Sequence, residues 1–155
     1  MNKLFSALTL ASAVSVGFLS LPAWAGELGT AADATAMVKK AVAYLKHNGK
    51  EKTLAEVSNS KGMFVDRDLY VSVYDLHGVV LAHGANPKLI GKDVSALKDA
   101  DGKAFIQDIL TQAKANGHGQ ADYKWPNSVT KNIQDKSAYF EKVDDMVISS
   151  GYSKS

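Results

Sequence analysis

Residues 73–87 of the chain read VYDLHGVVLAHGANP, and two apolar runs in this stretch flank the polar tetrapeptide Asp75–Gly78. Asp and Gly are typical of tight turns, whereas β-branched and aromatic residues favour strands. We therefore predict a β-hairpin, whose first strand lies in LYVSVYD from residue 69 and whose second lies in VVLAH from residue 79. The second run ends on His83, whose imidazole could bond to nearby backbone or contact a bound molecule.

Upstream of the hairpin the spacing of apolar residues changes. Apolar side chains recur at three- and four-residue steps from Thr30 to about His47, which predicts an amphipathic helix. Thr30 or Asp33 can cap the start of this helix, and Asn48-Gly49 can end it. A shorter helix is expected around residues 54–57.

Downstream of the hairpin the pattern predicts one more helix and three more strands. The helix lies within residues 99–119 and has an apolar stripe from Phe105 to Ala113. The strands are expected in QADYKW (120–125), DKSAYFEKV (135–143) and MVISSGYS (146–153). The order of elements predicts an α+β domain in which helices cover one side of an antiparallel sheet of about five strands.

The first 25 residues differ in character from the remainder. Lys3 precedes an apolar run rich in small residues, and Pro22 interrupts this run before Ala23 and Ala25, which occupy the positions of an A-x-A cleavage site. We expect a cleaved signal peptide over 1–25, a ligand-binding domain over 26–155 and a periplasmic location. A membrane anchor is the alternative, because about 18 apolar residues approach the length that spans a bilayer.

Composition narrows the classes of function. The chain has no Cys and a formal net charge of +2, so it is not a disulfide scaffold and has no strong attraction to nucleic acid or anionic membrane. After residue 26 no apolar run approaches the length needed to span a bilayer. We expect neither a nucleic-acid partner nor membrane insertion of the mature chain.

Catalytic and metal-binding motifs are absent from the sequence. It contains no G-x-S-x-G elbow, no H-E-x-x-H pair and no G-x-x-x-x-G-K-[ST] phosphate loop. The four histidines, at 47, 77, 83 and 118, are too far apart to form a metal pair on one element. We expect no enzyme activity, no metal and no cofactor. An enzyme or metal carrier that uses the histidines ranks last among the interpretations.

Polar and aromatic residues gather in the predicted strands and form the candidate ligand-binding site. A cation beside neutral hydrogen-bond donors and an apolar wall is what a pocket for a small carboxylate requires. In this interpretation Lys136 supplies the charge, and His83 and Tyr139 donate hydrogen bonds. The cavity is then walled by Tyr123, Trp125 and Tyr74.

Each of these residues also has a purely structural interpretation. Lys136 could be a solvated charge on a strand face, His83 could bond to backbone, and Trp125 and Tyr139 could be core aromatics. Alternation also places Lys136 and Tyr139 on opposite faces of a regular strand. Both reach one pocket only if the strand contains a bulge or begins after Lys136.

The chain resembles the single Cache domain of the second type from about Met63 to Lys154. The resemblance is carried by Val-Tyr-Asp, Leu-Ala-His, Asp-Gly-Lys, Tyr-x-Trp-Pro, Lys-Ser-x-Tyr and the closing Ser-Gly-Tyr. It implies a PAS-like fold, with a long N-terminal helix on the sheet and a helical crossover between the second and third strands. It also implies a pocket between the sheet and that crossover, with His83, Tyr123, Trp125, Lys136 and Tyr139 as pocket residues.

Domains of this family commonly sense acetate, propionate, lactate or pyruvate as the outer portions of chemoreceptors and sensor kinases. The sequence shows no output segment before it ends at Ser155, so we expect a free domain that captures a small organic anion. It would feed signal transduction such as chemotaxis through a membrane sensor or chemoreceptor, and its N-terminal helix offers a surface for a homodimer. The alternative is an accessory interaction protein with a vestigial pocket, which docks on a membrane sensor.

Overall fold

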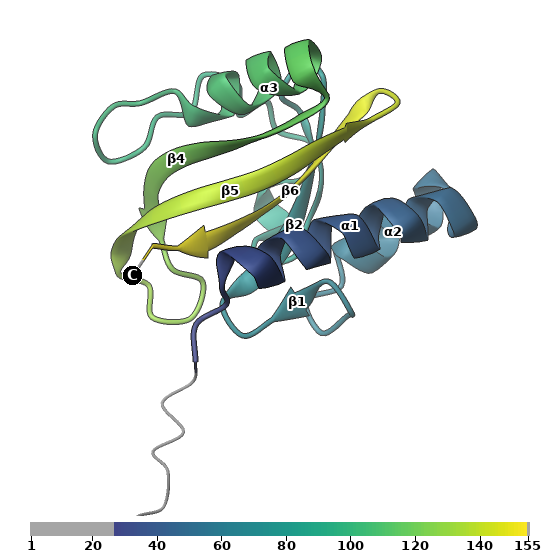
Figure 1. The fold of residues 1–155 in the computed structure, drawn as a ribbon, viewed down its shortest axis with the longest axis horizontal. Coiled ribbons are helices and arrows are strands. Elements are labelled where there is room, and N and C mark those ends of the chain that lie inside the picture. The colour runs from purple at the N-terminus through teal and green to yellow at the C-terminus, as the bar shows by residue number, and fades with distance from the viewer. Residues whose placement is uncertain (1–26, 155) are drawn as a thin grey trace, which may run out of the picture.

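The computed structural model describes residues 27–154, and Figure 1 shows the arrangement of its elements. The expected signal peptide lies outside the described residues. The helices are α1 (Ala31–Asn48), α2 (Lys50–Val57), the short 3-10 helix η1 (Pro87–Leu89) and α3 (Phe105–Asn116). The strands are β1 (Val65–Asp66), β2 (Leu69–Asp75), β3 (Val80–His83), β4 (His118–Pro126), β5 (Ile133–Val143) and β6 (Met146–Ser153).

Helix α1 begins and ends where its sequence predicts. Thr30 and Asp33 form a capping box, in which the Thr30 hydroxyl accepts from the Asp33 backbone N–H and the Asp33 carboxylate accepts from the Thr30 backbone N–H. Gly49 follows the last turn with φ 82°, a conformation that glycine adopts without strain. The apolar stripe of α1 is buried against the sheet through Ala34, Met37, Val38, Ala41, Val42 and Leu45.

The predicted hairpin is present as β2 and β3, which pair antiparallel. The Asp75 carboxylate organises the turn, because one of its oxygens accepts from the backbone N–H groups of His77, Gly78 and Val79 at 2.9 Å each. Gly78 has φ 100°, which explains the glycine at this position. His77 is exposed on the turn, whereas His83 at the end of β3 is buried.

The strands form one antiparallel sheet in the order β1-β2-β6-β5-β4, and β3 also pairs with β2. The expectation that helices cover one side of this sheet is wrong. Both faces are apolar, because Val71 and Ile148 lie in a core cluster with α1, whereas Phe140 and Val147 lie in a second cluster with α3. Each face therefore needs its own cover, and Figure 1 shows the sheet between α1 and α3.

Candidate functional site

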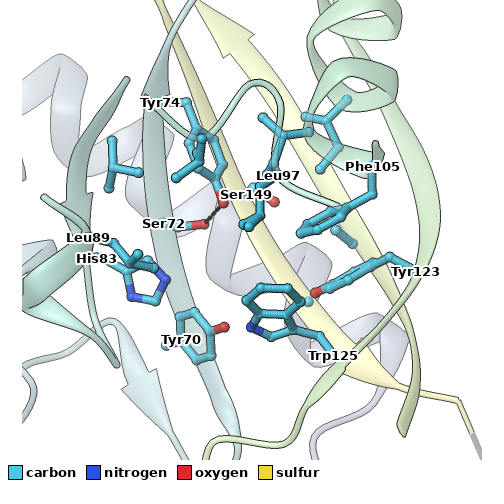
Figure 2. Close-up of a pocket in the computed structure, with 16 residues that line it drawn as sticks. Tyr70, Ser72, Tyr74, His83, Leu89, Leu97, Phe105, Tyr123, Trp125 and Ser149 are labelled. Atoms are coloured by element: carbon cyan, nitrogen blue, oxygen red, sulfur yellow. Dashed lines mark hydrogen bonds between the residues drawn. The ribbon is translucent and has the colours of Figure 1, made fainter. Parts of the chain in front are cut away.

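A cavity lies between the α3 face of the sheet and the chain that joins β3 to α3, residues 84–104, here called the covering segment. Within this cavity, a volume of about 40 Å³ is accessible to the centre of a water molecule. Figure 2 shows side chains that converge on it from both layers. The cavity is lined by Tyr70, Ser72, Tyr74, Val80, His83, Leu89, Val94, Leu97, Phe105, Ile106, Ile109, Tyr123, Trp125, Ala138, Ser149 and Gly151.

Strand β2 contributes three polar side chains to the cavity. Successive strand residues point to opposite faces, so Tyr70, Ser72 and Tyr74 share the face toward α3. The Ser72 hydroxyl donates to the Tyr74 hydroxyl at 3.0 Å, and burial raises the pKa of Tyr74. Tyr74 was expected here and Tyr70 was not, although the same alternation that selected Tyr74 also selects a tyrosine four residues earlier.

His83 lines the cavity from the end of β3, and its ring orientation is determined by backbone contacts. Its Nδ1 accepts from the backbone N–H groups of Ala85 at 3.2 Å and Asn86 at 2.9 Å. Burial lowers the pKa of His83 to about 4, so the ring is neutral at pH 7. Because Nδ1 accepts, the proton lies on Nε2, which donates to no other residue between 27 and 154. The ring packs on Tyr70 with a centroid distance of 4.8 Å.

Strand β4 provides the aromatic wall opposite β2. The Tyr123 ring stacks on Phe105 of α3, with centroids 4.6 Å apart and planes 8° apart, and Trp125 packs on the same phenylalanine at 5.4 Å. Burial raises the pKa of both Tyr123 and Tyr70, so their hydroxyls stay protonated. Neither hydroxyl forms a hydrogen bond with another described residue, which leaves two donors free at the cavity. Phe105 was predicted only as a core residue of its helix.

Lys136 is buried on β5, with a relative exposure of 1%. Its ammonium has no hydrogen-bond partner among the described residues. The side chain does not line the cavity directly. It lies on the same face as Tyr123, its register partner on β4, and its Cε is 3.6 Å from the position that a Cβ on Gly151 would occupy. Burial lowers the pKa of Lys136, and the charge of Asp68 opposes this shift.

Tyr139 is separated from the other candidate residues by the sheet itself. The register of β5 with β4 and β6 is continuous through residues 136–139, and β5 begins at Ile133, before Lys136. The bulge or late strand start that would bring both residues to one pocket is therefore not present. Tyr139 packs on the α1 side, donates to Glu141 at 2.7 Å and lies under the Lys39 ammonium. We leave it out of the candidate site.

The other histidines do not join the site. None of His47, His77 and His118 lines the cavity, and the described residues contain no group of three or more His, Cys, Asp or Glu that could hold a metal ion. No helix between residues 27 and 154 combines the length and apolar character that crossing a bilayer requires. The arrangement offers neutral donors around a small space lined by both polar and apolar side chains, with one buried cation nearby, which suits binding of a small polar molecule.

The fold and cavity define a PAS-like ligand-binding domain. The sequence of residues 26–153 matches the family model for Single Cache domain 2, so the chain belongs to the single Cache family and is a Cache-type sensor domain. Domains of this family are extracytoplasmic ligand-binding modules.

Relatives and solved structures agree with this family. The chain is 33% identical over 76 residues to the methyl-accepting chemotaxis protein McpP of Pseudomonas putida, covering 49% of this chain and 14% of that protein. It is 33% identical over 78 residues to the sensor histidine kinase MctS of Rhizobium johnstonii, covering 50% and 17%. A solved domain reported as the structural basis for carboxylic acid recognition by a Cache chemosensory domain matches with TM-score 0.62 and 23% identity, covering 78% and 86%. The chain thus spans a small part of the relatives' length.

Proposed function

We propose that this domain binds a short organic anion of the acetate, propionate, lactate or pyruvate class in the periplasm. Binding feeds signal transduction through a membrane sensor or chemoreceptor. The mature domain would begin after a signal peptide over 1–25, and α1 would provide a dimer surface.

The observation that carries this proposal is the unpartnered ammonium of Lys136, whose stem lies beside Gly151 of the cavity wall. A buried ammonium without a hydrogen-bond acceptor is destabilising, so such a group is retained where a ligand supplies the acceptor. The free hydroxyls of Tyr70 and Tyr123 and the Nε2–H of His83 are neutral donors around the same space. A carboxylate in the cavity would meet these neutral donors, and the Lys136 ammonium would supply the opposite charge from beside Gly151 of the cavity wall.

The size and lining of the cavity support a short ligand with one charged group. A water molecule needs about 10–15 Å³ of such space, so 40 Å³ corresponds to roughly three water molecules. Leu89, Leu97 and Phe105 offer an apolar surface for a methyl or ethyl tail. Lys136 is the one buried cation among the described residues, which favours a single carboxylate over a dicarboxylate.

The relatives support a membrane partner. McpP is a chemotaxis protein and MctS a sensor kinase, and carboxylic acid recognition is reported for a domain of the same fold. Asp68, whose charge acts on Lys136, accepts from the Gly29 backbone N–H at 2.7 Å and from the Ser153 hydroxyl at 3.4 Å. Asp68 therefore bonds to residues near both ends of the described chain, and its charge also acts on Lys136.

A thermal-shift screen tests the proposal. A ligand that binds only the folded state raises the melting temperature by mass action. Acetate, propionate, lactate and pyruvate should raise it, whereas acetamide and propionamide, which match the first two in shape without the charge, should leave it unchanged. A flat response to every acid, together with co-purification of a membrane sensor, would favour the accessory interaction protein with a vestigial pocket.

A further inference from the structure

Gly151 on β6 lines the cavity at a position where a Cβ would overlap a neighbouring side chain. A Cβ built on its backbone would overlap the Tyr123 hydroxyl oxygen and would lie 3.3 Å from Tyr123 Cζ and 3.6 Å from Lys136 Cε. The phenol of Tyr123 and the stem of Lys136 thus meet over the Cα of Gly151. The Tyr123 hydroxyl occupies the space of the missing side chain, and Lys136 Cε lies at ordinary van der Waals distance from it.

Backbone conformation does not explain this glycine. Five glycines of the described chain have positive φ, at positions 49, 78, 91, 102 and 117, and Gly151 is not among them. It lies in the regular part of β6 and pairs with Ala138 of β5. Glycine is usually disfavoured inside a strand, and one accepted reason for its presence is the close approach of another group.

Tyr123 has little freedom to move away from Gly151. Its ring stacks almost parallel on Phe105, which is 5% exposed in the first turn of α3. Its backbone is held in register opposite Lys136 along the uninterrupted β4–β5 pairing. A side chain at position 151 would therefore displace the Tyr123 hydroxyl and would disturb the stack with Phe105.

We propose that Gly151 is a specificity-determining residue, because its missing side chain is the notch that holds the Tyr123 hydroxyl beside the stem of Lys136 at the cavity wall. The role in ligand choice rests on the proposed function. The notch places one neutral donor beside the stem of the one buried lysine among the described residues, and a donor with a cation is the combination that selects a carboxylate over a neutral analogue. Filling the notch moves the donor away and reduces this selection.

A double-mutant cycle in the full chain tests the contact without any ligand. Gly151→Ala should lower the melting temperature by several degrees, and Tyr123→Phe should change it little, since the Tyr123 hydroxyl has no partner. The variant with both changes should recover most of the loss, because a Cβ 3.3 Å from Cζ needs only a small adjustment once the hydroxyl is removed. Ser150→Ala is the matched control on β6, since the Ser150 side chain lies on the α1 side.

Binding of acetate and propionate, measured by calorimetry, is the second readout. Gly151→Ala should weaken binding at least tenfold, and Ser150→Ala should leave it unchanged. A double variant as unstable as Gly151→Ala would overturn the notch, whatever the wild type binds. Recovery of the melting temperature with unaltered acid affinity in Gly151→Ala would overturn the role in specificity. A wild type that binds no acid refutes the proposed function and with it that role, whereas the thermal cycle still reports on the notch itself.

Discussion

Lys136 and His83 are both buried polar side chains whose pKa is lowered by burial, but only His83 forms hydrogen bonds with other described residues. Loss of hydration lowers the pKa of each side chain because the charged form is disfavoured. His83 responds by staying neutral and by accepting two backbone N–H groups. Lys136 finds no acceptor among the described residues, and only the charge of Asp68 favours its ammonium form.

Lys136→Met should stabilise the ligand-free protein. Methionine keeps the length of the stem and removes a buried group that lacks a hydrogen bond, so the free energy of unfolding should rise by about 1–3 kcal/mol. Urea unfolding of the wild type and the variant without ligand measures this difference in the free energy of unfolding. A purely structural lysine would behave in the opposite way, and a clear loss of stability in the variant would contradict an unpartnered ammonium.

His83 should make stability depend on pH between about 6.5 and 4. Its pKa is lowered to about 4 in the folded state, against 6.5 for the unfolded chain, so below pH 6.5 the unfolded chain binds a proton that the folded chain does not. Stability from this residue is complete above pH 6.5 and is reduced by about 2 kcal/mol at pH 5.

Urea unfolding at pH 7.5 and pH 5 should therefore show a smaller loss of stability in His83→Asn than in the wild type. His77→Asn is the control, because His77 is exposed on the hairpin turn. Carboxylates with lowered pKa values add the same pH dependence of stability to the wild type and to both variants. Equal pH dependence in the wild type and His83→Asn would contradict a neutral, buried His83.

At the scale of elements, one carboxylate joins the last part of the covering segment to β4. The Asp99 oxygens accept from the backbone N–H groups of Asp101, Lys103 and Lys124, each at 2.9 Å, and the last of these lies on β4. These bonds lower the pKa of Asp99. The carboxylate thereby fixes the end of the covering segment between Leu97 and α3.

Asp99→Ala should destabilise the domain by about 1–3 kcal/mol, because three backbone donors lose their acceptor. Asp101→Ala is a matched control two residues away, since its carboxylate forms an exposed ion pair with Lys124 and should contribute at most about 1 kcal/mol. Chemical denaturation compares the two variants. Equal losses would show that Asp99 does not anchor the segment.

The elements that the sequence predicts well are those determined by local patterns. Helix α1 and the β2–β3 hairpin follow from a capping box, an apolar stripe and an Asp-to-Gly turn, all within a few residues. The sequence did not predict that helices cover both faces of the sheet. Which helix covers which apolar face depends on contacts between residues that are far apart in the sequence, and no local pattern specifies these contacts. For the same reason Tyr139 was grouped with Lys136 by motif, although an uninterrupted strand places the two on opposite faces.

The sequence likewise predicted some of the residues that line the cavity and missed others. Tyr74, His83, Tyr123 and Trp125 line the space, as expected, whereas their role as ligand contacts stays a prediction. The sequence did not identify Phe105 as a cavity residue, because a phenylalanine in the apolar stripe of a helix is typical of any core position. The burial of Lys136 could not be read from the sequence either, since it depends on the neighbouring strands.

At the scale of the whole molecule, the sheet separates two functions between its faces. The α1 face is an apolar core, whereas the α3 face combines a core with a cavity that holds polar groups. The single Cache family assignment explains this division, because a sensor domain needs a stable scaffold and a site that responds to a ligand. The proposed function therefore depends on whether a small anion reaches the Lys136 ammonium, which has no hydrogen-bond partner among the described residues.

Calorimetric titration of the wild type and Lys136→Met with acetate, propionate, lactate and pyruvate tests this claim most directly. Truncating one partner of a buried, charge-assisted contact costs about 2–5 kcal/mol of binding. We predict that at least one acid binds the wild type with one molecule per chain, and that Lys136→Met binds it more than tenfold more weakly while remaining folded. Equal affinity in the two proteins, or no binding by the wild type, would contradict the account.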